Sequence, residues 1–197
     1  MAIRIIPKLF ILQIKPISMA NLPLLFKTLN YAAEQHKAQR RKGMESVPYI
    51  NHPIKVTNII SQFIPDASDE LICASILHDV VEDTDATIDD IKNKFGDVIA
   101  SIVQEVTDDK SLSKVESRRK QIENAPKLSY NAKIIRVCDK ISNVRDICGE
   151  NIPDWDYKTK IEYLNWAEQV VYALDKFHEE LQFAFKDEVR WGRLKMK

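Results

Sequence analysis

The sequence has little glycine: only four of its 197 residues are of this type. Tight turns between strands depend on glycine, so this low content disfavours an all-β protein and fits a helical one. Cysteine is also scarce, and its three copies, Cys73, Cys138 and Cys148, are odd in number and lie in apolar helix-like runs. We interpret them as reduced packing residues in a reducing compartment, and we expect the protein to be cytoplasmic.

Long hydrophobic runs are absent as well. No stretch reaches the roughly 18 to 20 apolar residues that a membrane-spanning helix needs. The 29 basic residues balance the 29 acidic ones, so the formal net charge is zero. A neutral chain has no overall attraction for nucleic acid or for a membrane surface, and any anion-binding surface must be local. We therefore expect neither partner, whereas the oligomeric state stays open.

Residues 1–20 differ from the rest of the chain. They contain no acid, they carry Arg4, Lys8 and Lys15, and they end in a small-x-small pattern that resembles a cleavage site. Their apolar stretch is short and is interrupted at Lys15 and Pro16, which weakens the interpretation as a targeting signal. We interpret residues 1–20 as a leader, with Met19 as an alternative start, and residues 21–197 as one folded domain.

From residue 22 onward the apolar residues recur at three- and four-residue intervals, as Leu25 and Leu29 do. This period is typical of amphipathic helices, and no segment alternates as a strand does. The basic residues at 40–42 suit the end of the first helix, because the C-terminus of a helix attracts cations. A loop at 43–51 follows. The pattern predicts a single all-α domain, with helices at about residues 24–42, 52–64, 68–83, 87–95, 97–109, 111–125, 129–148 and 157–189.

Residues with a preference for helix ends mark several of these boundaries. Ser68 and Thr87 stand where N-caps are expected, and Pro53 falls in the first turn of its helix. Gly96 is expected to end a helix. The last segment is either one long helix or two helices broken near Phe177.

The segment ILHDVVEDT, residues 76–84, places a histidine and several acids in an otherwise apolar run. Burial of a carboxylate costs several kcal/mol unless it is paired or binds a metal. On a helix, His78 and Glu82 lie four residues apart, as do Asp79 and Asp83, so each pair shares a face. His78 and Asp79 suit a hard divalent cation such as Mn²⁺, Fe²⁺, Mg²⁺ or Zn²⁺. The alternative is a solvated acidic helix end, which fits residues 82–85 better than it fits His78 and Asp79.

Two further polar positions interrupt apolar runs. Asp139 lies within AKIIRVCDKISNV and forms a polar stripe with Asn143 and Asp146, at positions i, i+4 and i+7. His52 stands just before the proline of an expected helix. A single aspartate on a helix usually faces solvent and a single histidine before a helix is usually a cap, so spacing alone does not join these residues to His78.

Taken in order, four segments resemble the HD-domain metal phosphohydrolases: RRK…PYINHP, LHDVVEDT, FGDVIASIVQEVTDDKSL and VCDKISNVRDI. Among these, the chain is most similar to the hydrolase domain of the RelA/SpoT family, in the form of the small stand-alone alarmone hydrolases. The resemblance runs from about residue 31 to about residue 173. It implies a single HD-domain helical bundle without a substantial sheet.

The resemblance also implies roles for individual residues. One Mn²⁺ ion would be held by His52, His78, Asp79 and Asp139, while Glu82 and Asp83 would orient or deprotonate the attacking water. A divalent ion lowers the pKa of its water, and a nearby carboxylate takes the proton. The substrate would be guanosine tetra- or pentaphosphate, (p)ppGpp, which would lose pyrophosphate from the ribose 3′ position. The residues expected to contact it are Arg41, Lys42, Tyr49, Lys110, Lys114, Asn143 and Arg145.

Two other interpretations of the same residues stay open. Members of the stand-alone type also act as NADPH 2′-phosphatases, and the sequence does not separate a phosphate on the ribose 2′ oxygen from one on the 3′ oxygen. The chain would otherwise be a module that binds the alarmone without hydrolysing it. The presence of Glu82 and Asp83 argues against such a module, because it would need no water-activating acid.

Overall fold

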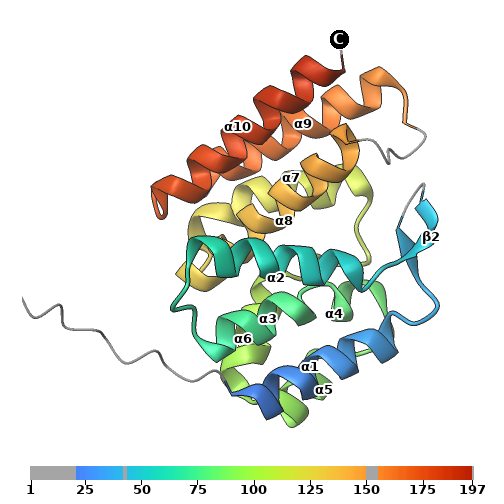
Figure 1. Ribbon diagram of the computed structural model, residues 1–197, viewed down its shortest axis with the longest axis vertical. Helices are drawn as coiled ribbons and strands as arrows, with labels where there is room; N and C mark the ends of the chain where they lie inside the picture. The colour runs from blue at the N-terminus through green and yellow to red at the C-terminus, as the bar shows by residue number, and fades with distance from the viewer. Residues whose placement is uncertain (1–20, 42–43, 150–154, 197) are drawn as a thin grey trace, which may run out of the picture.

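The computed structural model describes residues 21–41, 44–149 and 155–196, so the leader at 1–20 and Lys42 lie outside the described residues. Within these residues the chain is a bundle of helices with one two-stranded hairpin, which confirms the expected all-α class (Figure 1). The elements are α1 (Leu22–Gln35), β1 (Arg40–Arg41), β2 (Met44–Pro48), α2 (Asn51–Phe63), α3 (Asp69–Leu77), α4 (Val80–Asp83), α5 (Ile88–Phe95), α6 (Asp97–Val106), α7 (Lys114–Asn124), the 3₁₀ turn Ala125–Lys127, α8 (Tyr130–Cys148), α9 (Tyr157–Ala173) and α10 (Glu179–Lys195).

Helix α8 forms the centre of the bundle. It packs against α10 and α2 and also against α6 and α9, while α1 and α5 lie at the far end of the molecule from α10 (Figure 1). Most residues of α8 are buried, among them the apolar Ile134, Ile135 and Ile141. The same helix also buries the polar Asp139 and Lys140. Because buried charges need partners, the middle of α8 is where a functional site is expected.

The first helix ends earlier than the sequence predicted. Helix α1 stops at Gln35, and Arg40–Arg41 form strand β1, which pairs antiparallel with β2 so that Arg41 lies opposite Met44. The expected helix end at 40–42 is therefore wrong for its two described residues. In this hairpin, Arg40 and Arg41 line the cavity described below.

The local signals for helix starts are confirmed. The side chain of Ser68 accepts a hydrogen bond from the amide of Leu71, and Thr87 forms a reciprocal capping box with Asp90. Gly96 ends α5 with a φ of 92°, a conformation that side chains with a Cβ rarely adopt. Each of these contacts joins residues only a few positions apart, so it can be predicted from the residue types alone.

The helix expected at 68–83 is broken. Helix α3 ends at Leu77 and α4 begins at Val80, and His78 and Asp79 form a turn between them. The expected continuous helix is therefore wrong, although His78 and Glu82 still line the same cavity. The break instead leaves His78 and Asp79 at a junction between two helices.

The C-terminal segment forms two helices, α9 and α10, with Phe177 in the turn between them, as one of the two alternatives predicted. The cysteines Cys73, Cys138 and Cys148 are all buried and none forms a disulfide, in agreement with their expected packing role. None of the helices in the described ranges is both long and apolar enough to cross a membrane.

Candidate active site

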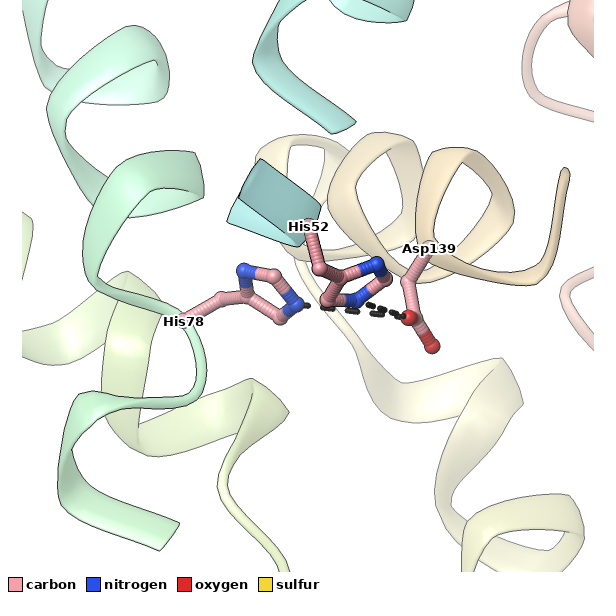
Figure 2. Close-up of side chains that lie close together, drawn as sticks. All are labelled: His52, His78 and Asp139. Carbon is pink, nitrogen blue, oxygen red and sulfur yellow. Dashed lines mark hydrogen bonds and ion pairs between the residues drawn. The ribbon is translucent and has the colours of Figure 1, made fainter. Parts of the chain in front are cut away.

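Three side chains from distant parts of the sequence meet at one buried point. His52 comes from the first turn of α2, His78 from the junction after α3, and Asp139 from the middle of α8 (Figure 2). Each offers one possible ligand atom, and these atoms all lie within 4.8 Å of one another. All three residues are buried, which makes the group more than a surface cluster of charge.

The distances fit a divalent cation. Nε2 of His52 lies 3.1 Å from Oδ1 of Asp139, and Nε2 of His78 lies 4.0 Å from the same oxygen. Oδ2 of Asp79 lies 3.1 Å from Nε2 of His78 and 3.6 Å from Nε2 of His52. Donor atoms at about 2.1 Å from one ion are roughly 3.0 Å apart at right angles and about 4.2 Å apart across it. Asp79 therefore reaches both histidines at ligand-like distances, although it is not part of the tighter group of three.

Both imidazole rings are oriented by their second nitrogen. Nδ1 of His78 donates to the backbone oxygen of Ser75 at 2.8 Å, and Nδ1 of His52 lies 3.2 Å from the hydroxyl of Ser142. These contacts direct each Nε2 towards the carboxylates. Nε2 of His78 is buried and makes no hydrogen bond, even though Asp79 is close to it. Such an unsatisfied nitrogen, beside two carboxylates, fits a metal ligand whose other nitrogen is held by the backbone.

Burial and the neighbouring carboxylates shift the pKa values of the two histidines in opposite directions. Burial alone would lower the pKa of His78, but the adjacent carboxylate of Asp79 raises it to about 9. Burial dominates at His52 and lowers its pKa. Burial would raise the pKa of Asp79, but His78 lowers it overall, and Lys140 does the same for Asp139. Both aspartates are therefore ionised at neutral pH and provide the negative charge that a cation requires.

A second layer of hydrogen bonds fixes the two aspartates. The hydroxyl of Tyr49 donates to Oδ2 of Asp79 at 2.7 Å. The amide of Asn143 donates to Oδ1 of Asp139 at 2.6 Å, and Lys140 donates to Oδ2 at 2.9 Å. The hydroxyl of Tyr49 thus orients the carboxylate of Asp79. The expected contact of Tyr49 with substrate stays a prediction.

The two acids that follow the junction have different surroundings. Oε2 of Glu82 accepts a hydrogen bond from the backbone amide of Asp108 at 3.0 Å. Burial, with the nearby charges of Asp108 and Asp79, raises the pKa of Glu82 to about 7. Asp83 is exposed and accepts a hydrogen bond from the side chain of Gln39 at 2.9 Å. Glu82 is thus the acid whose proton affinity suits proton transfer near neutral pH.

These groups line one cavity of about 360 Å³. Within the described residues, the cavity brings together most of the side chains predicted from the sequence. Arg41 lies at its edge, bonded to Asn143 at 2.8 Å and to Asp146 at 2.9 Å. The predicted residues that line it are Arg41, Tyr49, His52, His78, Asp79, Glu82, Asp83, Lys114, Asp139 and Asn143.

Two predicted substrate contacts lie elsewhere. Arg145 pairs with Glu188 of α10 at 2.6 Å, because it is two residues beyond Asn143 and so points to the other side of α8. Lys110 donates to the backbone oxygen of Thr84 at 2.6 Å. Neither residue lines the cavity, so the structure does not bring them to the site.

The cavity also contains residues that sequence reasoning missed. One wall is aromatic and cationic: Arg118 lies over the rings of Tyr163 and Trp166, and Lys140 lies 4.4 Å from the ring centre of Trp166. Lys114 lies over Trp155 at 5.8 Å. The aromatic residues of α9 have the spacing of ordinary core residues, so no signal in the sequence distinguished them.

The class of the protein follows from the comparison with family models. Residues 28–164 match the model of the HD domain. The match covers more than half of the chain, and the chain therefore belongs to the HD-domain family, whose members are metal-dependent phosphohydrolases. This finding agrees with the helical bundle and with the candidate metal ligands at its centre.

The more particular relatives are named pyrophosphohydrolases. Guanosine-3′,5′-bis(diphosphate) 3′-pyrophosphohydrolase MESH1 of Danio rerio is 46% identical over 151 residues, which are 77% of this chain and 84% of the relative. The Homo sapiens protein of the same name is 41% identical over 162 residues, 82% and 90% of the two chains. A solved structure of a metazoan orthologue of SpoT, described as hydrolysing ppGpp, matches with a TM-score of 0.81 at 40% identity, covering 85% of this chain and 94% of the other. The resemblance inferred from the motifs is confirmed.

Proposed function

We propose that this protein is a Mn²⁺-dependent (p)ppGpp hydrolase, which converts the substrate and water to GDP or GTP and pyrophosphate. The observation that carries this proposal is the convergence of His52, His78 and Asp139 within 4.8 Å at the floor of a cavity. The activity named for relatives that are 41–46% identical supports the choice of substrate. Oxygen and imidazole ligands without thiolate suit several hard divalent ions, of which Mn²⁺ is one.

In this proposal His52, His78, Asp79 and Asp139 hold the ion. A bound divalent ion would lower the pKa of a water and polarise a phosphoryl oxygen of the substrate. Glu82, which is partly buried beside the proposed ligand Asp79, would accept the proton of the attacking water. The water oxygen bonds to the phosphorus next to the ribose, the bond from this phosphorus to the 3′ oxygen breaks, and the 3′ oxygen takes the proton that Glu82 had accepted. The products are a free 3′ hydroxyl and pyrophosphate.

The remaining walls of the cavity suit a polyphosphate nucleotide. Arg41, Lys114 and Arg118 place positive charge around a site whose floor is acidic. Guanidinium and ammonium groups are the side chains that bind phosphate oxygens. The rings of Trp155 and Tyr163 lie beside these cations and offer apolar faces to a purine base. We assign the phosphates to the cations and the base to this aromatic wall.

The test compares two substrates side by side. Purified protein with Mn²⁺ is incubated with ppGpp or with NADPH, and released pyrophosphate and orthophosphate are measured separately. We expect pyrophosphate from ppGpp, and loss of this activity in Asp139→Ala. Orthophosphate from NADPH with ppGpp left intact would overturn the proposed substrate. Turnover of ppGpp that survives removal of divalent ions by a chelator would overturn the metal mechanism.

A further inference from the structure

Asp83 stands at the end of the short helix α4, exposed and at the edge of the cavity. An exposed aspartate at the last turn of a four-residue helix has many accessible rotamers. The structure holds it through Gln39, whose Nε2 donates to Oδ2 of Asp83 at 2.9 Å. Gln39 belongs to the turn between α1 and β1, so the contact joins segments 44 residues apart.

Gln39 is itself held in one orientation. Its Oε1 lies 2.6 Å from Nδ1 of His36, the residue that caps the C-terminus of α1. The amide can accept from the imidazole only through its oxygen, so its nitrogen is left to donate to Asp83. The hydrogen bond with His36 therefore orients the side-chain amide of Gln39 so that its nitrogen faces the carboxylate of Asp83.

Among the described residues, the side chain of His36 makes no hydrogen bond other than the one to Gln39. The residue is 1% exposed, and its Nε2 is buried without a hydrogen-bond partner. Burial of a polar nitrogen without a hydrogen-bond partner costs folding free energy. An apolar ring at position 36 would avoid this cost. The hydrogen bond to Gln39 is the contact that an apolar ring would not reproduce.

The turn between α1 and β1 also supports Asp79, through Tyr49. The ring of His36 packs on the ring of Tyr49 with centroids 4.8 Å apart, and the hydroxyl of Tyr49 donates to Asp79. The backbone amide of Tyr49 donates to the backbone oxygen of Gln39 at 3.1 Å. The α1–β1 turn thus reaches Asp79 through Tyr49 and Asp83 through Gln39.

We infer that Gln39, oriented by His36, is a positioning residue that holds the carboxylate of Asp83 at the cavity in which the hydrolysis is proposed. The inference rests on the proposed function, because it assigns Asp83 a role in the hydrolysis. Donation by a neutral amide keeps the carboxylate an acceptor and restricts its rotation without adding a charge to the site. The side chain of Gln39 acts through Asp83, and its two hydrogen bonds given above go to His36 and Asp83 rather than to a proposed metal ligand.

The test is a double-mutant cycle on the hydrolysis of ppGpp. Gln39→Leu removes the donor at similar volume, and we expect kcat to fall about tenfold while KM and the Mn²⁺ affinity change less than twofold. Asp83→Asn lowers kcat further, and adding Gln39→Leu to it should produce no additional loss. Lys37→Gln, in the same turn but exposed, is the matched control and should retain full kcat.

Three results would overturn the inference: independent losses that multiply in the double variant, a rise in KM at unchanged kcat, or full activity in Gln39→Leu. His36→Phe keeps the ring that packs on Tyr49 but removes the Nδ1 donor, and it should reproduce the loss of kcat.

A separate measurement distinguishes this inference from the proposed function. Nitrogen NMR of the wild-type protein should show His36 protonated at Nδ1, and the Nδ1 proton should shift in Gln39→Leu. Failure of the wild type to hydrolyse ppGpp would refute the proposed function while leaving this hydrogen-bonded arrangement measurable. An Nδ1 that carries no proton would refute the arrangement itself.

Discussion

Glu82→Gln should make the metal-free protein more stable while removing most of its activity. The folded protein holds the proton of Glu82 more tightly than the unfolded chain does, because the pKa rises from 4.5 to about 7. This carboxyl group therefore favours folding at low pH, and its contribution is lost as the pH rises from about 4.5 through 7. Above pH 7 the folded state contains an ionised acid beside Asp108 and Asp79.

The size of the effect follows from the pKa difference of about 2.5. At about 1.4 kcal/mol for each unit of pKa, ionisation of Glu82 costs up to about 3 kcal/mol of folding free energy. A glutamine avoids this cost and still offers an oxygen to the backbone amide of Asp108. For a chain of this size, about 3 kcal/mol corresponds to a rise of about 6–12 °C in Tm. Loss of a general base lowers kcat by about 10² to 10⁴.

The assay is urea unfolding of chelator-treated wild type and Glu82→Gln between pH 4.5 and 8.5. The stability difference should be near zero at the lowest pH, grow through pH 6 and level off above pH 8. Glu123→Gln, at an exposed acid on α7 that pairs with Arg119, is the control and should show no such trend. A variant that is less stable than the wild type at pH 8, or a difference that does not depend on pH, would refute the reasoning.

Three further predictions concern other parts of the structure. Arg41→Gln should raise the KM for ppGpp about tenfold through loss of one phosphate contact, whereas Arg145→Gln, on the other side of α8, should leave steady-state kinetics unchanged. Asp79→Ala should weaken Mn²⁺ binding in calorimetry by at least about tenfold while the far-ultraviolet spectrum stays helical. Gly192→Ala should lower the unfolding free energy by about 1–3 kcal/mol, because the new Cβ would lie 2.5 Å from Sγ of Cys148, and Cys148→Ala should relieve the loss.

Much of the fold could be predicted from the sequence because its signals are local. The cap at Thr87 joins a side chain to an amide three residues away, so the residue types suffice to find it. The hairpin at β1 and β2 could not be found in this way. Its strands are short, and the basic residues at 40–42 fit the end of a helix equally well.

The candidate site could be predicted only in part, for a similar reason. The motifs nominated His52, His78 and Asp139, but their meeting depends on how α2, α3 and α8 pack, and this information lies in contacts far apart in the chain. Arg145 was wrongly predicted to line the site. It is only two residues from Asn143 in sequence, but residues two apart on a helix point to different sides. Trp166 was missed because an aromatic residue on a helix is usually part of the core.

The most direct measurement of the central claim is the position of the metal. A crystal of the protein with Mn²⁺, measured at a wavelength where manganese scatters anomalously, locates the ion without reference to any assumed role. We predict a single strong peak in the cavity, within about 2.5 Å of Nε2 of His52 and of His78 and of a carboxylate oxygen of Asp139. A protein that hydrolyses ppGpp with Mn²⁺ but shows no peak among these side chains would contradict the account.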